Sequence, residues 1–163
     1  MKQLLISVLL VLPILISVAQ PKCKIKKAYA FYTVSVPGMQ MVDENGNPIP
    51  PQIDITRFIY LEWSGLKRPE IETVLYNKKP LLATVTAVPG STVNPESEFV
   101  NTNGFKITAS KNNSLWKIDL QTVSGSPMPD QNCKNIIIKI KGTGKTCAFK
   151  LVNERQLMTL PRY

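Results

Sequence analysis

Apolar and polar residues alternate most regularly between Asn135 and Val152, where the sequence reads NIIIKIKGTGKTCAFKLV. Two glycines near the middle favour a tight turn, so the two arms predict a β-hairpin. One face of that hairpin pairs apolar residues: Ile136 with Leu151, Ile138 with Phe149 and Ile140 with Cys147. The other face is rich in lysine, which predicts an antiparallel sheet with one buried face and one wet, basic face.

The same alternation predicts a second hairpin between Phe105 and Val123, with its turn at Asn112 and Asn113. Asparagine tolerates the left-handed backbone that a two-residue hairpin loop requires. In this register three apolar pairs face each other: Phe105 with Leu120, Ile107 with Ile118 and Ala109 with Trp116. On the opposite face, Lys106 is expected beside Asp119.

Shorter stretches of alternation predict further strands at residues 24–36, 53–63, 71–76 and 81–88. The last two flank a turn from Asn77 to Pro80. Residues 53–63 place Ile53, Ile55, Ile59, Leu61 and Trp63 on one face, which Arg57 interrupts. Residues 89–103 form the longest stretch with a weak pattern, and loops of that size are either functional or mobile.

Eight or so short strands, frequent turn residues and no long segment with a period of 3.6 predict an all-β fold. We expect an antiparallel β-sandwich that is immunoglobulin-like in general architecture, with a small β-barrel as the alternative. The phrase VDENGNPIP at residues 42–50 resembles the turn of bacterial immunoglobulin-like and related β-sandwich modules. The resemblance covers these nine residues and implies the sandwich.

The first 19 residues have the composition of a secretory signal peptide. Lys2 gives a charged start, residues 4–18 are apolar, and Ser17-Val18-Ala19 is a small-residue cleavage pattern. Cleavage after Ala19 leaves residues 20–163 as one β domain, exported to the periplasm or the extracellular space and without a transmembrane span. The full chain has a net charge of +9, and removal of the leader with Lys2 leaves +8.

Export permits disulfides, and with three cysteines one thiol must stay unpaired. The predicted hairpin directs Cys147 into the core opposite Ile140. Cys133 precedes Ile140 by roughly 23 Å along an extended strand, too far to bond Cys147. We therefore expect Cys23 to bond Cys133 and Cys147 to stay reduced; the alternative leaves Cys23 and Cys133 unpaired as well.

The chain contains no histidine, which excludes His-based triads and most zinc and non-haem iron sites. We expect no metal and no cofactor. Candidates for acid–base chemistry are Glu70 and Glu72, which share a strand face, and Glu62 on another strand. The favoured interpretation is that all three are solvated surface groups, so no catalytic residue is assigned.

Six aromatic residues are candidates for a carbohydrate- or peptide-binding surface: Trp63, Trp116, Tyr29, Phe31, Tyr32 and Tyr60. The favoured alternative is that they pack in the core, because aromatic side chains dominate core burial.

The basic face of the C-terminal hairpin is the candidate binding site. Lys139, Lys141 and Lys150 project from it, and Lys145 lies at its turn. Such a cluster attracts polyanions by a salt-sensitive force, so acidic glycans and anionic lipid headgroups are candidate ligands. The partner itself is not identified, and an envelope protein is a further candidate. Export argues against nucleic acid. The favoured interpretation is that the lysines keep the sheet soluble and block aggregation.

The sequence therefore favours a small exported cell-envelope or secreted β-sandwich module with a non-enzymatic role in binding, adhesion or assembly. The alternative is a secreted hydrolase that uses carboxylates on polysaccharide, which requires glutamates to converge in one pocket.

Overall fold

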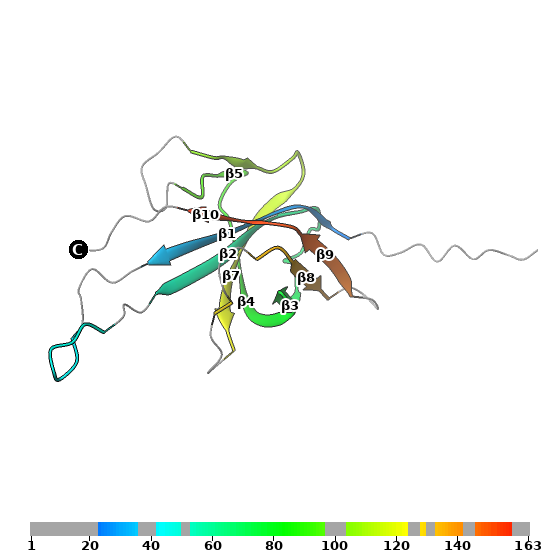
Figure 1. The fold of residues 1–163 in the computed structure, drawn as a ribbon. Coiled ribbons are helices and arrows are strands. Elements are labelled where there is room, and N and C mark those ends of the chain that lie inside the picture. The colour runs from blue at the N-terminus through cyan, green and yellow to red at the C-terminus, as the bar shows by residue number, and fades with distance from the viewer. Residues whose placement is uncertain are drawn as a thin grey trace, which may run out of the picture.

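The computed structural model describes residues 23–35, 42–49, 53–96, 104–123, 128–129, 133–141 and 146–157. Within these residues every regular element is a β-strand, as Figure 1 shows. The strands are β1 (Ile25–Ser35), β2 (Asp54–Trp63), β3 (Ile71–Tyr76), β4 (Lys79–Ala87), β5 (Thr92–Val93), β6 (Ile107–Thr108), β7 (Ser114–Thr122), β8 (Ile136–Ile140), β9 (Cys147–Leu151) and β10 (Glu154–Leu157). Among the same residues, no helix has the length and hydrophobicity that a membrane span requires. The predicted signal peptide lies outside the described residues.

Eight of the strands form one mixed sheet in the order β10-β1-β2-β7-β4-β3-β8-β9. Only Val152 and Asn153 separate β9 from β10, so one C-terminal segment pairs first with β8 and then with β1. The sheet therefore curls into a nearly closed barrel, with β10 alongside β1 in Figure 1. Counted as one, β9 and β10 make seven strands around the barrel. An odd number of alternating strands leaves one parallel pair, which falls between β1 and β10.

The prediction of an all-β fold is confirmed, and the architecture is the barrel that was the alternative to two packed sheets. The strand order still follows the immunoglobulin fold. With β1, β2, β3, β4, β7, β8 and β9 named A to G, the order is A-B-E-D-C-F-G, and immunoglobulin domains divide this order into the sheets A-B-E-D and C-F-G. Here β3 and β4 remain hydrogen-bonded, so the two halves form one sheet.

The segment 42–49 forms a compact turn in the long connection between β1 and β2, and it projects from the barrel in Figure 1. Val42 pairs with Pro48 across it. The Asp43 carboxylate accepts hydrogen bonds from the side chain and backbone of Asn47, which lower the pKa of Asp43. Gly46 has a φ of 79°, a left-handed conformation that glycine adopts without strain.

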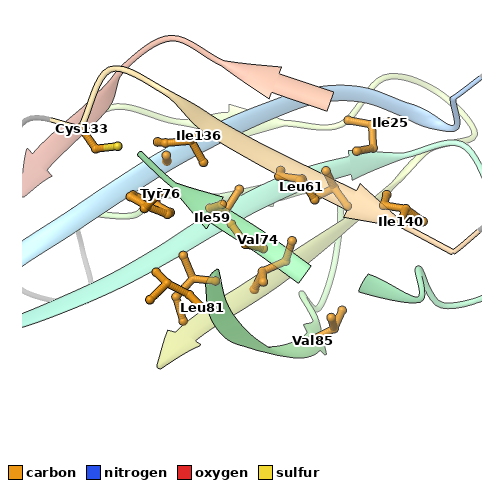
Figure 2. Close-up of a cluster of buried hydrophobic side chains, with 14 of the residues drawn as sticks. Ile25, Ile59, Leu61, Val74, Tyr76, Leu81, Val85, Cys133, Ile136 and Ile140 are labelled. Carbon is orange, nitrogen blue, oxygen red and sulfur yellow. The ribbon is translucent and has the colours of Figure 1, made fainter. Parts of the chain in front are cut away.

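An inner core of mostly aliphatic side chains fills the barrel. Figure 2 shows Ile59, Leu61, Val74, Ile136 and Ile140 pointing toward one another from β2, β3 and β8. All five are buried. Complete burial of one such side chain contributes about 1.5–3 kcal/mol, so the curl of the sheet is favoured by the apolar surface that it encloses.

The C-terminal hairpin is confirmed in the predicted register, with Ile138 opposite Phe149 and Ile140 opposite Cys147. The strand predictions at 24–36 and 53–63 correspond to β1 and β2. The hairpin of β3 and β4 also forms, and its turn residues Asn77 and Lys78 have φ angles of 47° and 71°. Those angles are typical of a two-residue turn that matches the twist of the strands.

The second predicted hairpin is wrong. Both edges of β7 are occupied, by β2 and by β4, so the segment before its turn cannot pair there. That segment crosses the outer face instead, where β6 pairs with β5. The predicted pair of Lys106 and Asp119 is therefore not formed; Oδ1 of Asp119 lies 3.6 Å from Nζ of Lys117 on the same strand. The turn itself forms, because Asn112 is left-handed and the Asn113 N–H donates to the carbonyl of Ser110.

The described residues between β4 and β7, 88–96 and 104–113, cover a second core on the outer face of β1, β2 and β7. Its buried members are Phe31, Phe58, Tyr60, Ile107, Ala109, Leu115 and Leu157. The rings of Phe31, Phe58 and Tyr60 have centroids 5.7–6.1 Å apart, within the usual range of packed aromatic pairs. Because β2 is covered on both faces, every residue from Arg57 to Trp63 is buried.

Arg57 lies inside the barrel with its side chain fully buried. Its Nε donates to Oε2 of Glu154 at 3.1 Å, and its Nη2 donates to Oε1 at 3.3 Å. Its Nη1 donates to the carbonyl of Pro129 at 2.8 Å, and its guanidinium lies 5.3 Å from the ring centroid of Tyr76. The Glu154 carboxylate also accepts a hydrogen bond from the backbone N–H of Cys133. This ion pair ties β10 to β2 and to the segment that precedes β8.

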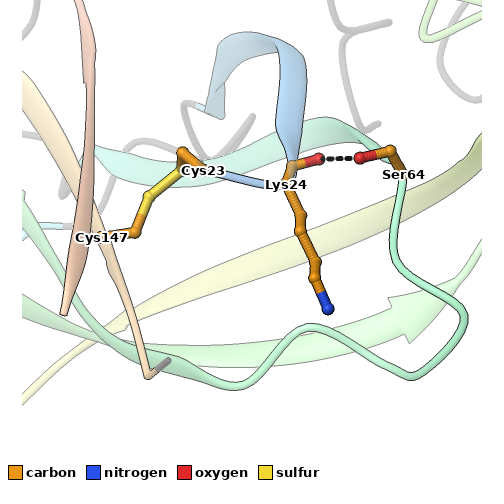
Figure 3. The surroundings of a disulfide bond; sticks show 4 residues. All are labelled: Cys23, Lys24, Ser64 and Cys147. Carbon is orange, nitrogen blue, oxygen red and sulfur yellow. Dashed lines mark hydrogen bonds between the residues drawn. A yellow bond between two sulfur atoms is a disulfide. The ribbon is translucent and has the colours of Figure 1, made fainter. Parts of the chain in front are cut away.

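The predicted disulfide is wrong, because Cys23 bonds Cys147 (Figure 3). The free cysteine is Cys133, which is buried. Cys147 does lie opposite Ile140, as predicted. The curl of the sheet, which alternation along the sequence does not reveal, brings the start of β9 against the start of β1. The two Cα atoms are 5.8 Å apart, and the bond closes the barrel where β1 and β9 have no hydrogen-bonded register.

Replacement of both Cys23 and Cys147 by serine should lower the free energy of unfolding by about 4–5 kcal/mol, because the bond joins residues 124 positions apart. Urea denaturation measures the change. The control is Cys133→Ala, which keeps the bond and should cost only about 1 kcal/mol for a small buried group. Mass mapping that finds Cys133 in a bridge of the unreduced protein would contradict the assignment.

Candidate functional site

A shallow groove opens on the outer face of the barrel, beside the point where the C-terminal segment passes from β8 to β1. Its volume is about 190 Å³. The lining residues are Ala28, Tyr29, Ala30, Phe31, Phe105, Asn153, Glu154 and Arg155. A concave surface of aromatic rings with a few polar groups has the composition of a ligand-binding site.

Strand alternation decides which side chains face this groove. Tyr29 and Phe31 lie on the outer face of β1, against the outer core. In the parallel register of β1 and β10, Arg155 is the partner of Phe31, whereas the preceding residue Glu154 turns inward to Arg57. The aromatic side chains of β1 and the guanidinium of Arg155 therefore share one side of the sheet.

Phe105 forms the opposite wall of the groove and is 38% exposed. Its ring lies edge-to-face against Tyr29, with centroids 5.8 Å apart. The Arg155 guanidinium lies 5.3 Å from the centroid of Phe105, and its Nη2 donates to Oε1 of Glu96 at 2.8 Å. A Cβ atom on Gly104 would overlap the Glu96 carboxylate, so glycine at this position permits the ion pair.

The predicted basic face lies on the outer side of β8 and β9. Lys139 on β8 is half-buried there. Lys150 on β9 and Lys141, the residue directly after β8, are exposed. We call these three residues the basic hairpin face. Lys145 lies outside the described residues. In the part of the chain that the structure describes, none of the three has an ion-pair partner.

Three more exposed lysines, Lys24, Lys26 and Lys27, lie at the start of β1. The bond between Cys23 and Cys147 holds this end of β1 beside β9. Cations therefore occur on both strands that meet at the disulfide, and Lys27 precedes the groove residue Tyr29 by two positions on the same strand.

The structure does not bring the candidate carboxylates together. Glu62 is buried on β2, where it accepts hydrogen bonds from the Ser110 N–H at 3.0 Å and the Asn113 side chain at 2.5 Å. Glu70 and Glu72 are exposed at β3, and β7 and β4 separate that strand from β2 in the sheet. Glu62 thus anchors the turn before β7. Across the described ranges, no three His, Cys, Asp or Glu side chains gather as metal ligands would.

Most of the aromatic candidates pack as the favoured alternative stated: Phe31, Tyr32, Tyr60 and Trp63 are buried, and Tyr29 and Trp116 are half-buried. Of the six, Tyr29 and Phe31 line the groove. The sequence did not identify Phe105, Asn153 or Arg155. β10 has only four residues, too few to show alternation, and no local signal pairs it with β1.

Comparison of the chain with models of protein families, with curated proteins and with solved structures finds no match in any of the three.

Glu62→Gln should destabilise the protein by about 1.5–3 kcal/mol, because charged hydrogen bonds to the 110–113 turn are lost. Burial raises the pKa of Glu62, but hydrogen bonds from Asn113 and Ser110 and the charge of Lys27 outweigh it and lower the pKa below 4.5. This stabilisation is complete above the unfolded pKa and disappears as the pH falls through the folded pKa. The free energy of unfolding, measured by urea denaturation, should differ less between wild type and variant at pH 3 than at pH 7. An equal difference at the two pH values would contradict this prediction.

Proposed function

We propose that the protein is an exported cell-envelope or secreted module with a non-enzymatic binding role, and that the basic hairpin face holds an acidic glycan. The observation that carries this proposal is the group of three lysines on one hairpin, none of them neutralised by an ion pair in the described residues. Unpaired charges on one face sum to a local positive potential that attracts polyanions.

The shape and charge of the hairpin support a surface contact and not a deep site. Lys139 is paired with Ala148 and Lys150 with Ile137, so each of these lysines has a small or apolar residue opposite it in the hairpin. Such a face offers several separate cations to an extended anionic chain. The disulfide between Cys23 and Cys147 is consistent with an oxidising compartment outside the cytoplasm.

The alternative of a carboxylate-dependent hydrolase receives no support from a specific pair of residues. The buried carboxylates of Glu62 and Glu154 are engaged in hydrogen bonds that hold a turn and a strand. Both groups therefore have structural tasks in the folded protein.

The triple variant Lys139→Gln, Lys141→Gln and Lys150→Gln should elute from an anionic glycan matrix at lower salt than the wild type. Each lost contact with a polyanion releases roughly 0.7–0.9 fewer counterions, so the slope of log affinity against log salt should fall by about 2. The matched control changes Lys78, Lys79 and Lys111, which are exposed elsewhere, to glutamine and has the same net charge. If both triple variants elute alike, retention follows net charge alone and the hairpin face is not a binding site.

A further inference from the structure

The groove between Tyr29, Phe105 and Arg155 has the size of one part of a larger ligand. Its volume of about 190 Å³ is below the roughly 300–1,000 Å³ of pockets that enclose a drug-sized molecule. It is open on the outer face, so a chain can continue beyond it. A polymer that places one ring in the groove fits this geometry better than a free small molecule.

The walls of the groove are suited to the apolar face of a sugar ring. Tyr29 and Phe105 meet edge-to-face, and Phe105 remains partly exposed. The face of an aromatic ring is the negative pole of its quadrupole, so it attracts the weakly positive C–H groups of a pyranose. The Asn153 amide at the rim supplies donors and an acceptor for hydroxyl groups.

Arg155 is the basic residue among those that line the groove, and its guanidinium is the feature that suits an acidic ring. Of the two carboxylates near it, Glu154 is fully buried against Arg57, and Glu96 is paired with Arg155. Lys27, two positions before Tyr29, lies opposite the carboxylate of Glu62 in the register of β1 and β2, so Arg155 is the cation at the groove. A guanidinium presents a planar fork that matches a carboxylate, so Arg155 is the group that a uronate would contact.

Arg155 already holds a carboxylate, that of Glu96, at 2.8 Å. The Arg155 side chain is 55% exposed and the Glu96 side chain 22%, and exposed ion pairs of this kind contribute only about 0–1 kcal/mol. An incoming carboxylate can therefore replace Glu96 at little cost, since one ion pair is exchanged for another.

We infer that this groove is a subsite for a single acidic sugar ring of the uronate type. Tyr29 and Phe105 contact the ring, Arg155 binds its carboxylate, and Glu96 occupies the same guanidinium in the free protein. The inference rests on the proposed function, because it takes an acidic glycan as the ligand. It goes beyond the proposed function, because it places the recognition of a sugar ring at β1 and β10 and not on the basic hairpin face.

The test is calorimetric titration of the full mature protein with a short oligouronate at low salt. Arg155→Gln should weaken binding about tenfold or more, and methyl esterification of the oligouronate should have a similar effect on the wild type. Glu96→Gln should strengthen binding several-fold, because the competing carboxylate is removed. Thermal unfolding of both variants confirms that each is folded.

Weakened binding by Glu96→Gln, equal to that by Arg155→Gln, would show that the pair only holds the groove in shape and would overturn the inference. Unchanged affinity of Arg155→Gln would overturn it as well.

If hexaglutamate binds as tightly as the oligouronate, the groove recognises charge and the sugar assignment fails. Loss of binding in the basic-hairpin triple variant, with Arg155→Gln like wild type, removes the subsite and leaves the proposed function intact. Absence of wild-type binding at low salt removes both.

Discussion

The docking of the C-terminal strand β10 against β1 is the constraint on which the rest of the structure depends. β10 supplies Glu154, which neutralises the guanidinium of Arg57 inside the barrel. A buried charge without its partner costs several kcal/mol, so the sequence of β2 is compatible with a folded core only when β10 is in place. The disulfide between Cys23 and Cys147 acts at the other end of the same junction, where β1 and β9 approach each other without a ladder of hydrogen bonds.

This closure also shapes the outer surface. Because side chains alternate along a strand, the residue that follows the inward-facing Glu154 must face outward. Arg155 is thereby placed on the same side as Tyr29 and Phe31, at the border of the outer core. Glu154, which forms the ion pair inside the barrel, and Arg155, whose guanidinium lies at the groove, are consecutive residues of β10. A change in how β10 docks would therefore alter the core and the candidate ligand site together.

Local pattern was sufficient where a strand pairs with its neighbour in sequence, as in the hairpin of β8 and β9, whose register follows from alternation alone. It failed for residues 105–109, because alternation identifies the buried face of a strand but not which edge is free. It failed for Cys23 for a related reason, since the curl of the sheet depends on contacts between distant segments. Arg57 appeared in the sequence only as an interruption of an apolar face, and its partner lies 97 residues away. The sequence identified two residues of the groove, Tyr29 and Phe31, as candidates for binding. It did not identify Phe105 and Arg155, because contacts between distant segments bring them to the groove.

Hydrogen exchange of the backbone amides in the variant Glu154→Gln tests this account most directly. If β10 docks because of the buried ion pair, the amides of β10 and of the β1 residues that pair with it, Ala30 to Thr33, should lose protection. The pairs of the β4–β7 ladder that lie away from Arg57, Thr86 with Lys117 and Ala87 with Trp116, should keep their protection, because Arg57 pairs with Leu120 near the other end of β7. Unchanged exchange at β10 in a folded variant would contradict the claim that this pair closes the barrel.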